Sequence, residues 1–555
     1  MKGTIWVSML VGTAYAADWG DLRDPRAELA PMERALAEQF GPPVPKSARP
    51  AARPSVGTRR TFWAYDYAQE RFYEVDATCR AAGDYCYVFV ADDQWGSRVS
   101  QTDVDGLLRG FEDETPADHS KGVFQRTVEA LGEPLDVDGD PKVYVLLLDI
   151  RDGFEEDGRY IGGYFSGVNE YPDWQARLNG YRSNEIEIFY VDVNPGDPSS
   201  KQTQAVLAHE LQHMIHFGYD RDEEDWINEG CSVFSEWWNG FGPRAPDHFK
   251  DRPDDSLVEW DGDLADYEQA GMFVHYLYEH WGGIETVRAL VQEPADGVEG
   301  VDQTLKKRGY PAGFRDVFRD WVLANYVDDP TVGDGRYAYE AYDLHGRYRF
   351  SDLRMYDRYP VPPQIGEVRF GGVDYLRFVD GREVYLNFRG EDELPFFVQV
   401  VQIPREGNIT VSSLSLRDNF ARTRLEDTLV LAVTVEAEVE GAAYQYSAEI
   451  ATYVARQEGL PGGFYLYPNF PNPFNAYTAF RFELGKSASV DLTVYDLKGR
   501  RVRTLLRGEL PAGGHMAVWD GRDERGDEVG SGLYLCRLQT ADRTFQQVRA
   551  MVLVR

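Results

Sequence analysis

Residues His209–His213 read His-Glu-Leu-Gln-His, and the segment 226–230, which follows closely, reads Trp-Ile-Asn-Glu-Gly. Apolar residues flank the first stretch at helical spacing, and Gly218 is placed to end the run, so we expect a helix there. Histidines four residues apart lie one turn apart on one helical face, so both imidazoles can reach one ion. Neutral imidazole is a good zinc ligand, and a tetrahedral site needs a third protein ligand.

The third ligand is predicted to be Glu229. His216 is the nearest alternative, but on a straight helix its Cα lies about 10.5 Å along the axis from that of His209, too far for one small ion. Glu229 begins a second run with helical spacing, residues 229–238. Glu236 lies two turns further on roughly the same face, where it is either a partner for a ligating histidine or a solvated glutamate.

The two motifs resemble those of the gluzincin peptidases and are most similar to those of the secreted hyicolysin-type metallopeptidases. The resemblance covers about residues 61–345 and implies a zincin-like domain with a mixed sheet and an α-helical lobe. It also implies that Zn²⁺ is held by His209, His213 and Glu229. Glu210, beside the first ligand, would then act as the general base that activates water.

Two related patterns fit less well. The metzincin pattern needs glycine where this chain has His216 and histidine where it has Tyr219. In thermolysin-like enzymes an aspartate follows the glutamate ligand by four residues, and Val233 stands there in this chain. The hydrogen bonds that such an aspartate makes to a metal ligand in thermolysin-like enzymes are therefore not expected in this chain.

A water attack on a peptide carbonyl also needs a group that stabilises the developing oxyanion. Tyr267, near the start of a predicted helix over 263–281, is our first candidate, and His275 or His280 on the same helix are alternatives. A tyrosine that serves packing alone is the competing interpretation. The alternating stretch 185–193 is expected to border the cleft and to pair with an extended substrate.

Composition and the N-terminus indicate an exported protein. The net charge of −35 argues against nucleic acid as a partner. A short apolar run and Ala-Tyr-Ala at 14–16 predict a signal peptide, residues 1–16. Residues 17–60 are interpreted as a propeptide or disordered leader containing a possible amphipathic helix, 26–40. No transmembrane helix is expected, because no later stretch has eighteen apolar residues.

Two further side-chain groups carry predictions. Cys79 and Cys86 flank a turn-like spacer, and export would allow them to form a disulfide, whereas Cys231 is expected to be a buried packing residue and Cys536 has no evident partner. The run Asp136–Asp140 resembles the start of a calcium loop and predicts a Ca²⁺ site. A tight acidic turn is the alternative, because the glutamate that closes an EF-hand loop is absent.

The rest of the chain is predicted to be β-structure. Short β-prone runs in 346–460 indicate a β-sandwich accessory domain, and 461–555 forms a second β unit. The stretches 495–502 and 519–523 resemble the Ig-like C-terminal tails of type nine secretion substrates and the Ig-like domain of flagellar hook-capping proteins. This resemblance implies export by an outer-membrane secretion machinery, with the tail removed or used for surface attachment. A generic Ig-like domain is the alternative.

The sequence therefore predicts a multidomain α+β protein, with a zinc peptidase domain over 61–345 and two Ig-like β-sandwiches. The expected function is that of a secreted or surface-bound zinc endopeptidase acting on extracellular proteins or peptides. An idle, surface-displayed adhesion protein is the rival reading. A zinc aminopeptidase is a weaker one, because the chain has no Gly-x-Met-Glu-Asn motif upstream of the predicted zinc helix.

Overall fold

The computed structural model describes residues 23–44, 53–344, 354–381, 384–450, 464–475 and 477–554. The expected signal peptide, residues 1–16, lies outside the described residues, as do the expected domain boundaries near 346 and 461. Contacts divide the chain into two compact units. Unit 1 comprises Met1–Asp357, Pro363–Gly381 and Asn387–Tyr446, and unit 2 comprises Arg358–Pro362, Arg382–Leu386 and Ser447–Arg555.

Unit 1 begins with a six-stranded mixed sheet in the order β1-β2-β3-β4-β6-β5. The first three strands are antiparallel, β3, β4 and β6 are parallel, and β5 returns antiparallel at the edge. Every residue of β3 and β4 is buried, as expected for apolar runs in strands covered on both faces. The strands are β1 Arg59–Asp66, β2 Arg71–Ala82, β3 Cys86–Ala91, β4 Val143–Leu148, β5 Gly163–Phe165 and β6 Ile188–Asp192.

The position of β6 corrects one expectation. The alternating stretch does form a strand, but β6 pairs with β4 on one side and with β5 on the other. Both of its hydrogen-bonding edges are therefore used within the sheet, and it cannot add a substrate strand. On this side the sheet ends at β5, which precedes β6 in the chain, and the opposite edge strand is β1.

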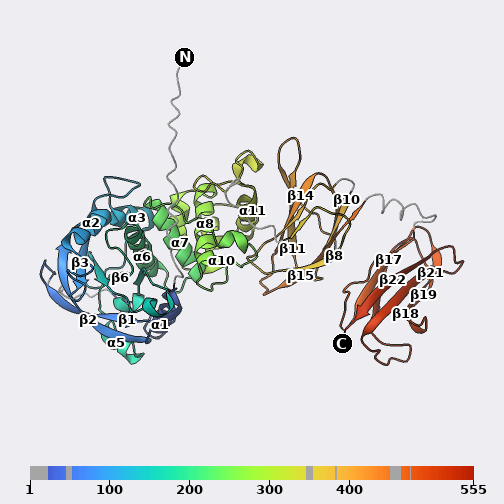
Figure 1. Ribbon diagram of the computed structural model, residues 1–555, viewed down its shortest axis with the longest axis horizontal. Helices are drawn as coiled ribbons and strands as arrows, with labels where there is room; N and C mark the ends of the chain where they lie inside the picture. Colours follow the sequence, from blue (N-terminus) through green and yellow to red (C-terminus); the bar gives the residue numbers. More distant parts are fainter. Residues whose placement is uncertain are drawn as a thin grey trace, which may run out of the picture. The chain divides into compact units, whose positions relative to one another are not determined.

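Helices pack on this sheet. The helix α6, which carries the two histidines, lies against β5 and β6 and beside α2 and α3 (Figure 1). The helices of this half of the unit are α1 Arg26–Phe40, α2 Gln101–Glu112, α3 Val123–Leu131, α4 Phe154–Asp157, α5 Asp173–Leu178 and α6 Lys201–Tyr219, with a 3₁₀ turn over Gly167–Glu170.

The N-terminal segment is a folded part of unit 1. The helix α1 occupies the range that its amphipathic pattern predicts, and its apolar face enters the core through Leu29 and Leu36, which are 1% and 0% exposed. A disordered leader therefore does not describe residues 23–44.

The second half of the unit is helical. It contains α7 Asp225–Trp238, α8 Leu264–His280, α9 Ile284–Val291, α10 Gly297–Lys307 and α11 Phe314–Val327, with 3₁₀ turns over Phe249–Asp251 and Gly333–Gly335. Helices α7 and α8 approach closely because Gly230 has no side chain: a Cβ there would lie 2.8 Å from the backbone oxygen of Ala270. This glycine, the last residue of the Trp-Ile-Asn-Glu-Gly motif, thus sets the spacing of two helices.

Two further sheets form the predicted accessory sandwich, in the orders β13-β10-β15-β8 and β12-β11-β14-β9-β7. Part of this sandwich shares the hydrophobic core of the helical lobe. The hydroxyl of Tyr375 in β9 also donates a hydrogen bond to Val322 O of α11 at 2.5 Å. The strands are β7 Arg354–Tyr356, β8 Val361–Val368, β9 Asp374–Phe378, β10 Val384–Gly390, β11 Phe396–Ile403, β12 Thr410–Ser413, β13 Phe420–Leu425, β14 Thr428–Val435 and β15 Ala442–Ile450.

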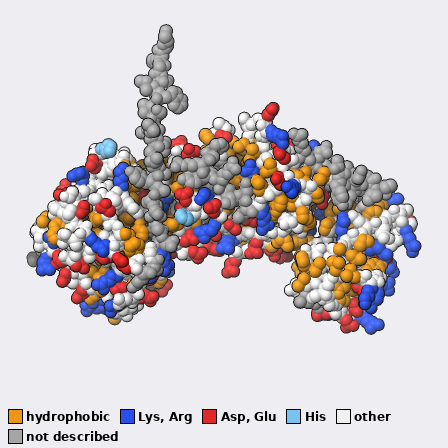
Figure 2. Space-filling view, viewed as in Figure 1, with side chains coloured by type: hydrophobic (Ala, Val, Ile, Leu, Met, Phe, Trp, Pro, Cys, Tyr) orange, Lys and Arg blue, Asp and Glu red, His pale blue; other side chains and the backbone are white. Residues whose placement is uncertain are grey.

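Unit 2 holds a second pair of sheets, β16-β17-β20 and β19-β18-β21-β22, around a core centred on the fully buried Trp519. On the face shown in Figure 2, hydrophobic side chains gather on this C-terminal sandwich. Its exposed large hydrophobic residues include Met516, Val518 and Leu533. The strands are β16 Tyr465–Leu466, β17 Thr478–Leu484, β18 Ala488–Asp496, β19 Arg501–Leu510, β20 Gly513–Trp519, β21 Gly532–Thr540 and β22 Gln546–Leu553.

The predicted disulfide is wrong for this structure. Cys79 and Cys86 are both free and buried, like Cys231 and Cys536. Cys79 lies opposite Phe89 in the β2–β3 ladder rather than opposite Cys86, and its thiol donates to the carbonyl of Ala81 at 3.2 Å. None of the described helices has the length and apolar character that crossing a membrane requires.

Candidate metal centre

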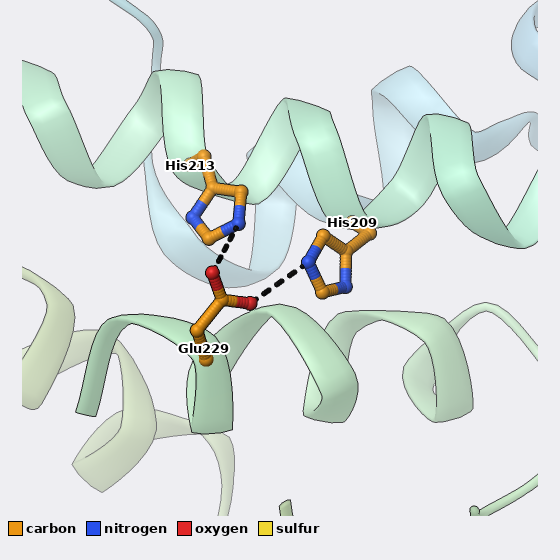
Figure 3. A group of neighbouring side chains, drawn as sticks. All are labelled: His209, His213 and Glu229. Atoms are coloured by element: carbon orange, nitrogen blue, oxygen red, sulfur yellow. Dashed lines mark ion pairs between the residues drawn. The ribbon is translucent and has the colours of Figure 1, made fainter. Parts of the chain in front are cut away.

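The helix α6 places both histidines on the face that meets α7. The helix starts at an N-cap, because the hydroxyl of Ser200 accepts the backbone N–H of Thr203 at 3.1 Å. Leu211 is fully buried in the core of unit 1, which fixes the rotation of the helix about its axis. His209 and His213 then point toward Glu229 on the neighbouring helix (Figure 3).

Three side chains converge as the sequence predicts. The Nε2 atom of His209 lies 3.0 Å from Glu229 Oε2, and that of His213 lies 3.4 Å from Glu229 Oε1. One potential ligand atom from each residue lies within 4.8 Å of the others, and all three residues are buried. Two imidazoles and one carboxylate are a donor set that suits Zn²⁺ with an open coordination position. The residues therefore fit the metal that the motif implies.

Hydrogen bonds orient both imidazoles. His209 Nδ1 donates to Glu236 Oε1 at 2.8 Å, and His213 Nδ1 donates to Asn228 Oδ1 at 2.7 Å. With Nδ1 engaged in this way, each Nε2 is the atom left to face Glu229. Glu236 is the partner that the sequence suggests. Asn228 was not predicted, although its place directly before Glu229 is a signal that could have identified it.

A cation also supports this outer carboxylate. The guanidinium of Arg244 contacts both oxygens of Glu236, at 2.5 and 3.2 Å. The charge of Arg244 and the hydrogen bond from His209 lower the pKa of Glu236 against the opposing effect of burial. Arg244 lies in an irregular segment with no local pattern, so sequence reasoning missed it.

The pKa shifts of His209 and Glu229 indicate that the carboxylates of the site favour positive charge beside them. Burial lowers the pKa of His209, but its hydrogen bonds to Glu229 and Glu236 and the charges of Glu229 and Glu210 outweigh that effect and raise the pKa to about 10. Burial raises the pKa of Glu229, yet the neighbouring imidazoles hold it well below its usual value. Glu229 therefore stays ionised, as a metal ligand must.

Glu210 lies beside this group and lines the same cavity. The backbone N–H of Phe165 in β5 donates to its Oε2 at 2.7 Å, which fixes one carboxylate oxygen. Burial raises the pKa of Glu210 above its usual value, and the positive imidazoles only partly oppose that effect. A carboxylate with a raised pKa is better matched to accepting a proton near neutral pH.

Tyr267 is brought to the site, and the two alternative histidines are not. Tyr267 lines the cavity, and its ring centroid lies 6.4 Å from that of His209. Burial raises its pKa well above the usual value, so the phenol keeps its proton. His275 instead packs against Trp237 with its Nδ1 3.1 Å from Gly271 O, and His280 Nε2 lies 2.9 Å from Ala338 O.

The cavity over the site is small, about 60 Å³, and the N-terminal segment forms part of its wall. Arg23, Pro25 and Arg26 line it together with the edge strand β5 and with the group of His209, His213 and Glu229. The backbone N–H of Arg23 donates to Tyr160 O at 3.1 Å, just before β5. Nothing in the local sequence of residues 23–26 indicates this placement.

The predicted calcium loop gains a carboxylate from another segment. Oxygen atoms of Asp136, Asp138 and Glu187 lie within 4.8 Å of one another. Asp140 is not part of this group, and its Oδ2 accepts a hydrogen bond from the hydroxyl of Tyr87 at 2.8 Å. A Ca²⁺ site here stays a prediction.

Comparisons with known proteins found one partial relative in sequence and one matching family model. In an alignment 213 residues long that covers 33% of this chain, the sequence is 30% identical to the neutral metalloprotease ShpI of Staphylococcus hyicus. The match covers 45% of that protein, so the chain spans less than half the length of this curated relative. A family model described as the FlgD Ig-like domain matches residues 474–543, within unit 2. The chain thus combines a segment similar to a metalloprotease with a C-terminal Ig-like domain.

Solved structures give weaker likenesses. One is PorZ, a bacterial surface component of the type-IX secretion system of Porphyromonas gingivalis, with a TM-score of 0.13 and 17% identity over 20% of this chain and 14% of that chain. Another is dimeric latent PorU from the same organism, with a TM-score of 0.16 and 16% identity over 37% of this chain and 19% of that chain. Scores this low support no functional statement.

Proposed function

We propose that the protein is a zinc-dependent endopeptidase that cleaves proteins or peptides outside the cell. The observation that carries the proposal is the convergence of His209, His213 and Glu229 with Glu210 beside them in one cavity. The partial similarity to a neutral metalloprotease supports it. Zinc held by the three ligands would supply Lewis acidity that activates water and polarises a peptide carbonyl.

Side chains of the site would transfer the proton and orient the reacting groups. Glu210, anchored by Phe165 N–H, would accept a proton from the attacking water and return it to the leaving amine. Tyr267, which keeps its phenolic proton, would donate a hydrogen bond to the oxyanion. Glu236 and Asn228 would hold the imidazoles in the tautomer that leaves Nε2 for the metal.

An extended substrate would pair with β5. Its backbone edge lies on the side of the sheet away from β6 and close to Glu210. Main-chain hydrogen bonds give affinity with little sequence preference, which suits a peptidase of broad specificity. This assignment replaces the role first expected for the β6 stretch.

We further propose that residues 23–26 restrain the enzyme, as expected for a pro-segment. Arg26 is bound to Asp225 at 2.8 Å, and Trp260 Nε1 donates to Asp24 Oδ2 at 2.9 Å. The segment thus forms part of the cavity wall and occupies the carbonyl of Tyr160 just before β5, where it would compete with a substrate that pairs with that strand. Because α1 packs in the core of unit 1, cleavage at a protease site engineered within 47–52 must be followed by separation of fragment 1–46 under mild denaturant and by refolding, after which hydrolysis of a large protein substrate should rise. Unchanged hydrolysis after the fragment is removed, in a chain that remains folded, would contradict this proposal.

The C-terminal Ig-like domain is proposed to direct export or surface attachment. The match of residues 474–543 to the FlgD Ig-like domain and the Ig-like tail motifs support this role. Deleting 464–555 in the native host should leave the peptidase inside the cell envelope. Normal release of the shortened chain would favour a generic accessory domain.

The peptidase activity itself is tested by casein hydrolysis that a chelator abolishes and zinc restores. A peptide blocked at its N-terminus separates the remaining possibilities, because an endopeptidase cleaves it and an aminopeptidase does not. If the purified, zinc-loaded chain hydrolyses neither casein nor peptides, the peptidase proposal is wrong. The alternative, a binding protein with a catalytically inactive peptidase fold, would then be favoured.

A further inference from the structure

A second group of carboxylates lies where the loop between α6 and α7 meets the start of α10. Oxygen atoms of Asp220, Asp222 and Asp296 lie within 4.8 Å of one another. Asp220 is the C-cap of α6, with its N–H donating to His216 O at 2.7 Å, and Asp296 is the N-cap of α10. Asp220 is buried, whereas Asp222 and Asp296 are exposed, so the group is open to solvent on one side.

Two buried carboxylate oxygens at this place have no hydrogen-bond donor among the described residues. They are Asp220 Oδ2 and Glu223 Oε2, on side chains that are 4% and 2% exposed. The other oxygen of Glu223 is used, because it accepts the N–H groups of Gly297 and Glu224 at 2.8 and 2.7 Å. Buried polar atoms nearly always have a partner, so two buried carboxylate oxygens without a donor in this loop call for a ligand.

The electrostatics of the group indicate that the ligand is a cation. Burial raises the pKa of Asp220 to about 7, and the charges of Asp296 and Asp222 add to the shift. Burial also raises the pKa of Glu223 to about 8, with a further contribution from Asp220. Backbone N–H groups oppose these shifts, and no Lys or Arg side chain is among their causes.

We propose that Asp220, Asp222 and Asp296, assisted by Glu223, bind a calcium ion. Ca²⁺ takes six to eight oxygen ligands at about 2.3–2.6 Å, so ligands on opposite sides of the ion are about 4.6–5.2 Å apart. The 4.8 Å limit on the three carboxylates fits that span. Calcium suits the site better than zinc because all the ligands are oxygen atoms, and its flexible geometry leaves room for water on the exposed side.

The proposed ion would join the start of α10 to the loop between the two helices that carry the proposed zinc ligands. Helix α6 carries His209 and His213, α7 carries Glu229, and the loop 220–224 is the covalent link between them. Fastening that loop to the start of α10 would fix the spacing of the two ligand-bearing helices. The role is structural, so its test needs no measurement of peptidase activity.

Terbium luminescence on the zinc-saturated full chain tests the site directly. Trp226 lies close by, with its Nε1 2.7 Å from Glu224 Oε2, and can transfer energy to bound Tb³⁺. We expect Trp-sensitised Tb³⁺ emission. Added Ca²⁺ should lower this emission by displacing the bound Tb³⁺, and Mg²⁺ should lower it much less. We also expect about 1 mM Ca²⁺ to raise Tm by about 3 °C.

The double variant D220N/D222N should bind Tb³⁺ at least about tenfold more weakly, because ligand charge sets calcium affinity. Its Tm in calcium-free buffer should equal or exceed that of the wild type, since it removes like charges. If this variant does not fold, D296N on α10 replaces it. The matched control is D136N/D138N at the other acidic group. Emission that survives D220N/D222N or D296N, or that D136N/D138N alone abolishes, would overturn the proposal.

Discussion

Glu236 Oε1 lies 2.8 Å from His209 Nδ1, two helical turns beyond Glu229 on the same helix. One face of α7 therefore offers both the proposed third ligand and the group that orients the first. The guanidinium of Arg244 in turn donates a hydrogen bond to Glu236 Oε1. A carboxylate–imidazole pair of this kind fixes the ring and raises its basicity toward a metal.

Replacing Glu236 tests this relationship. Glu236→Gln should weaken zinc affinity by about 10–100-fold, because an amide orients the imidazole less strongly than a carboxylate does. Competition with a chromophoric chelator measures the affinity. Glu299→Gln, at an exposed position on α10, is the control and should leave the zinc affinity unchanged. An unaltered affinity in Glu236→Gln would show that the contact does not tune the site.

Replacing Glu210 separates metal binding from proton transfer. Glu210→Gln should keep a full zinc stoichiometry and lower kcat by about 10³-fold, since the amide cannot accept a proton. Metal analysis and peptide hydrolysis on the same preparation provide both readouts. Wild-type turnover in this variant would remove Glu210 from the mechanism.

The close approach of α7 and α8 predicts a steric effect at Gly230. In Gly230→Ala the new Cβ would lie 2.8 Å from Ala270 O and 2.9 Å from Val274 Cγ2, so the helices must separate. We expect a loss of about 1–3 kcal/mol in the free energy of unfolding and weaker zinc binding. Gly106→Ala on α2 is the matched control. Its Cβ would meet nothing within 4 Å, and it should stabilise the chain by about 0.5–1 kcal/mol. Equal effects of the two substitutions would exclude the steric explanation.

Glu170 predicts a pH dependence of stability. Burial raises its pKa well above the usual value, with a further contribution from Glu187, and neither carboxylate oxygen has a hydrogen-bond partner among the described residues. The folded state binds this proton more tightly than the unfolded state does. Its contribution to stability is therefore complete below the unfolded pKa and is lost as the pH rises through the folded pKa.

The variant Glu170→Gln mimics the protonated acid at every pH. At pH 8 its Tm should exceed that of the wild type by about 2 °C or more, and the difference should shrink toward about pH 4. Thermal unfolding across this range measures both trends. A constant difference would show that Glu170 does not titrate between the folded and unfolded states.

The local features of the site follow from short-range spacing. His209 and His213 share a face because four residues make about one helical turn, and the same argument places Glu236 on the face of Glu229. The helix α1 matches its amphipathic pattern for the same reason. The buried strands β3 and β4 are likewise predictable, because their unbroken apolar runs suit strands covered on both faces.

The remaining features depend on segments that are distant in the sequence. Periodicity shows that the β6 stretch is a strand, but the pairing order alone decides that β5 is the open edge. The Cys79–Cys86 pairing failed because the ladder register, which spacing does not reveal, sets Cys79 against Phe89.

By itself the sequence placed His209 and His213 on one helical face, since helix geometry fixes neighbours three and four residues apart, and the resemblance of its two motifs to a known family implied Glu229 as the third ligand. Only the tertiary structure decided what surrounds it: Arg26 in the cavity wall, Arg244 on Glu236, and Asp296 beside Asp220. Such neighbours are brought together by the packing of whole helices and strands on a shared core. That packing reflects the summed burial of many residues rather than any local pattern.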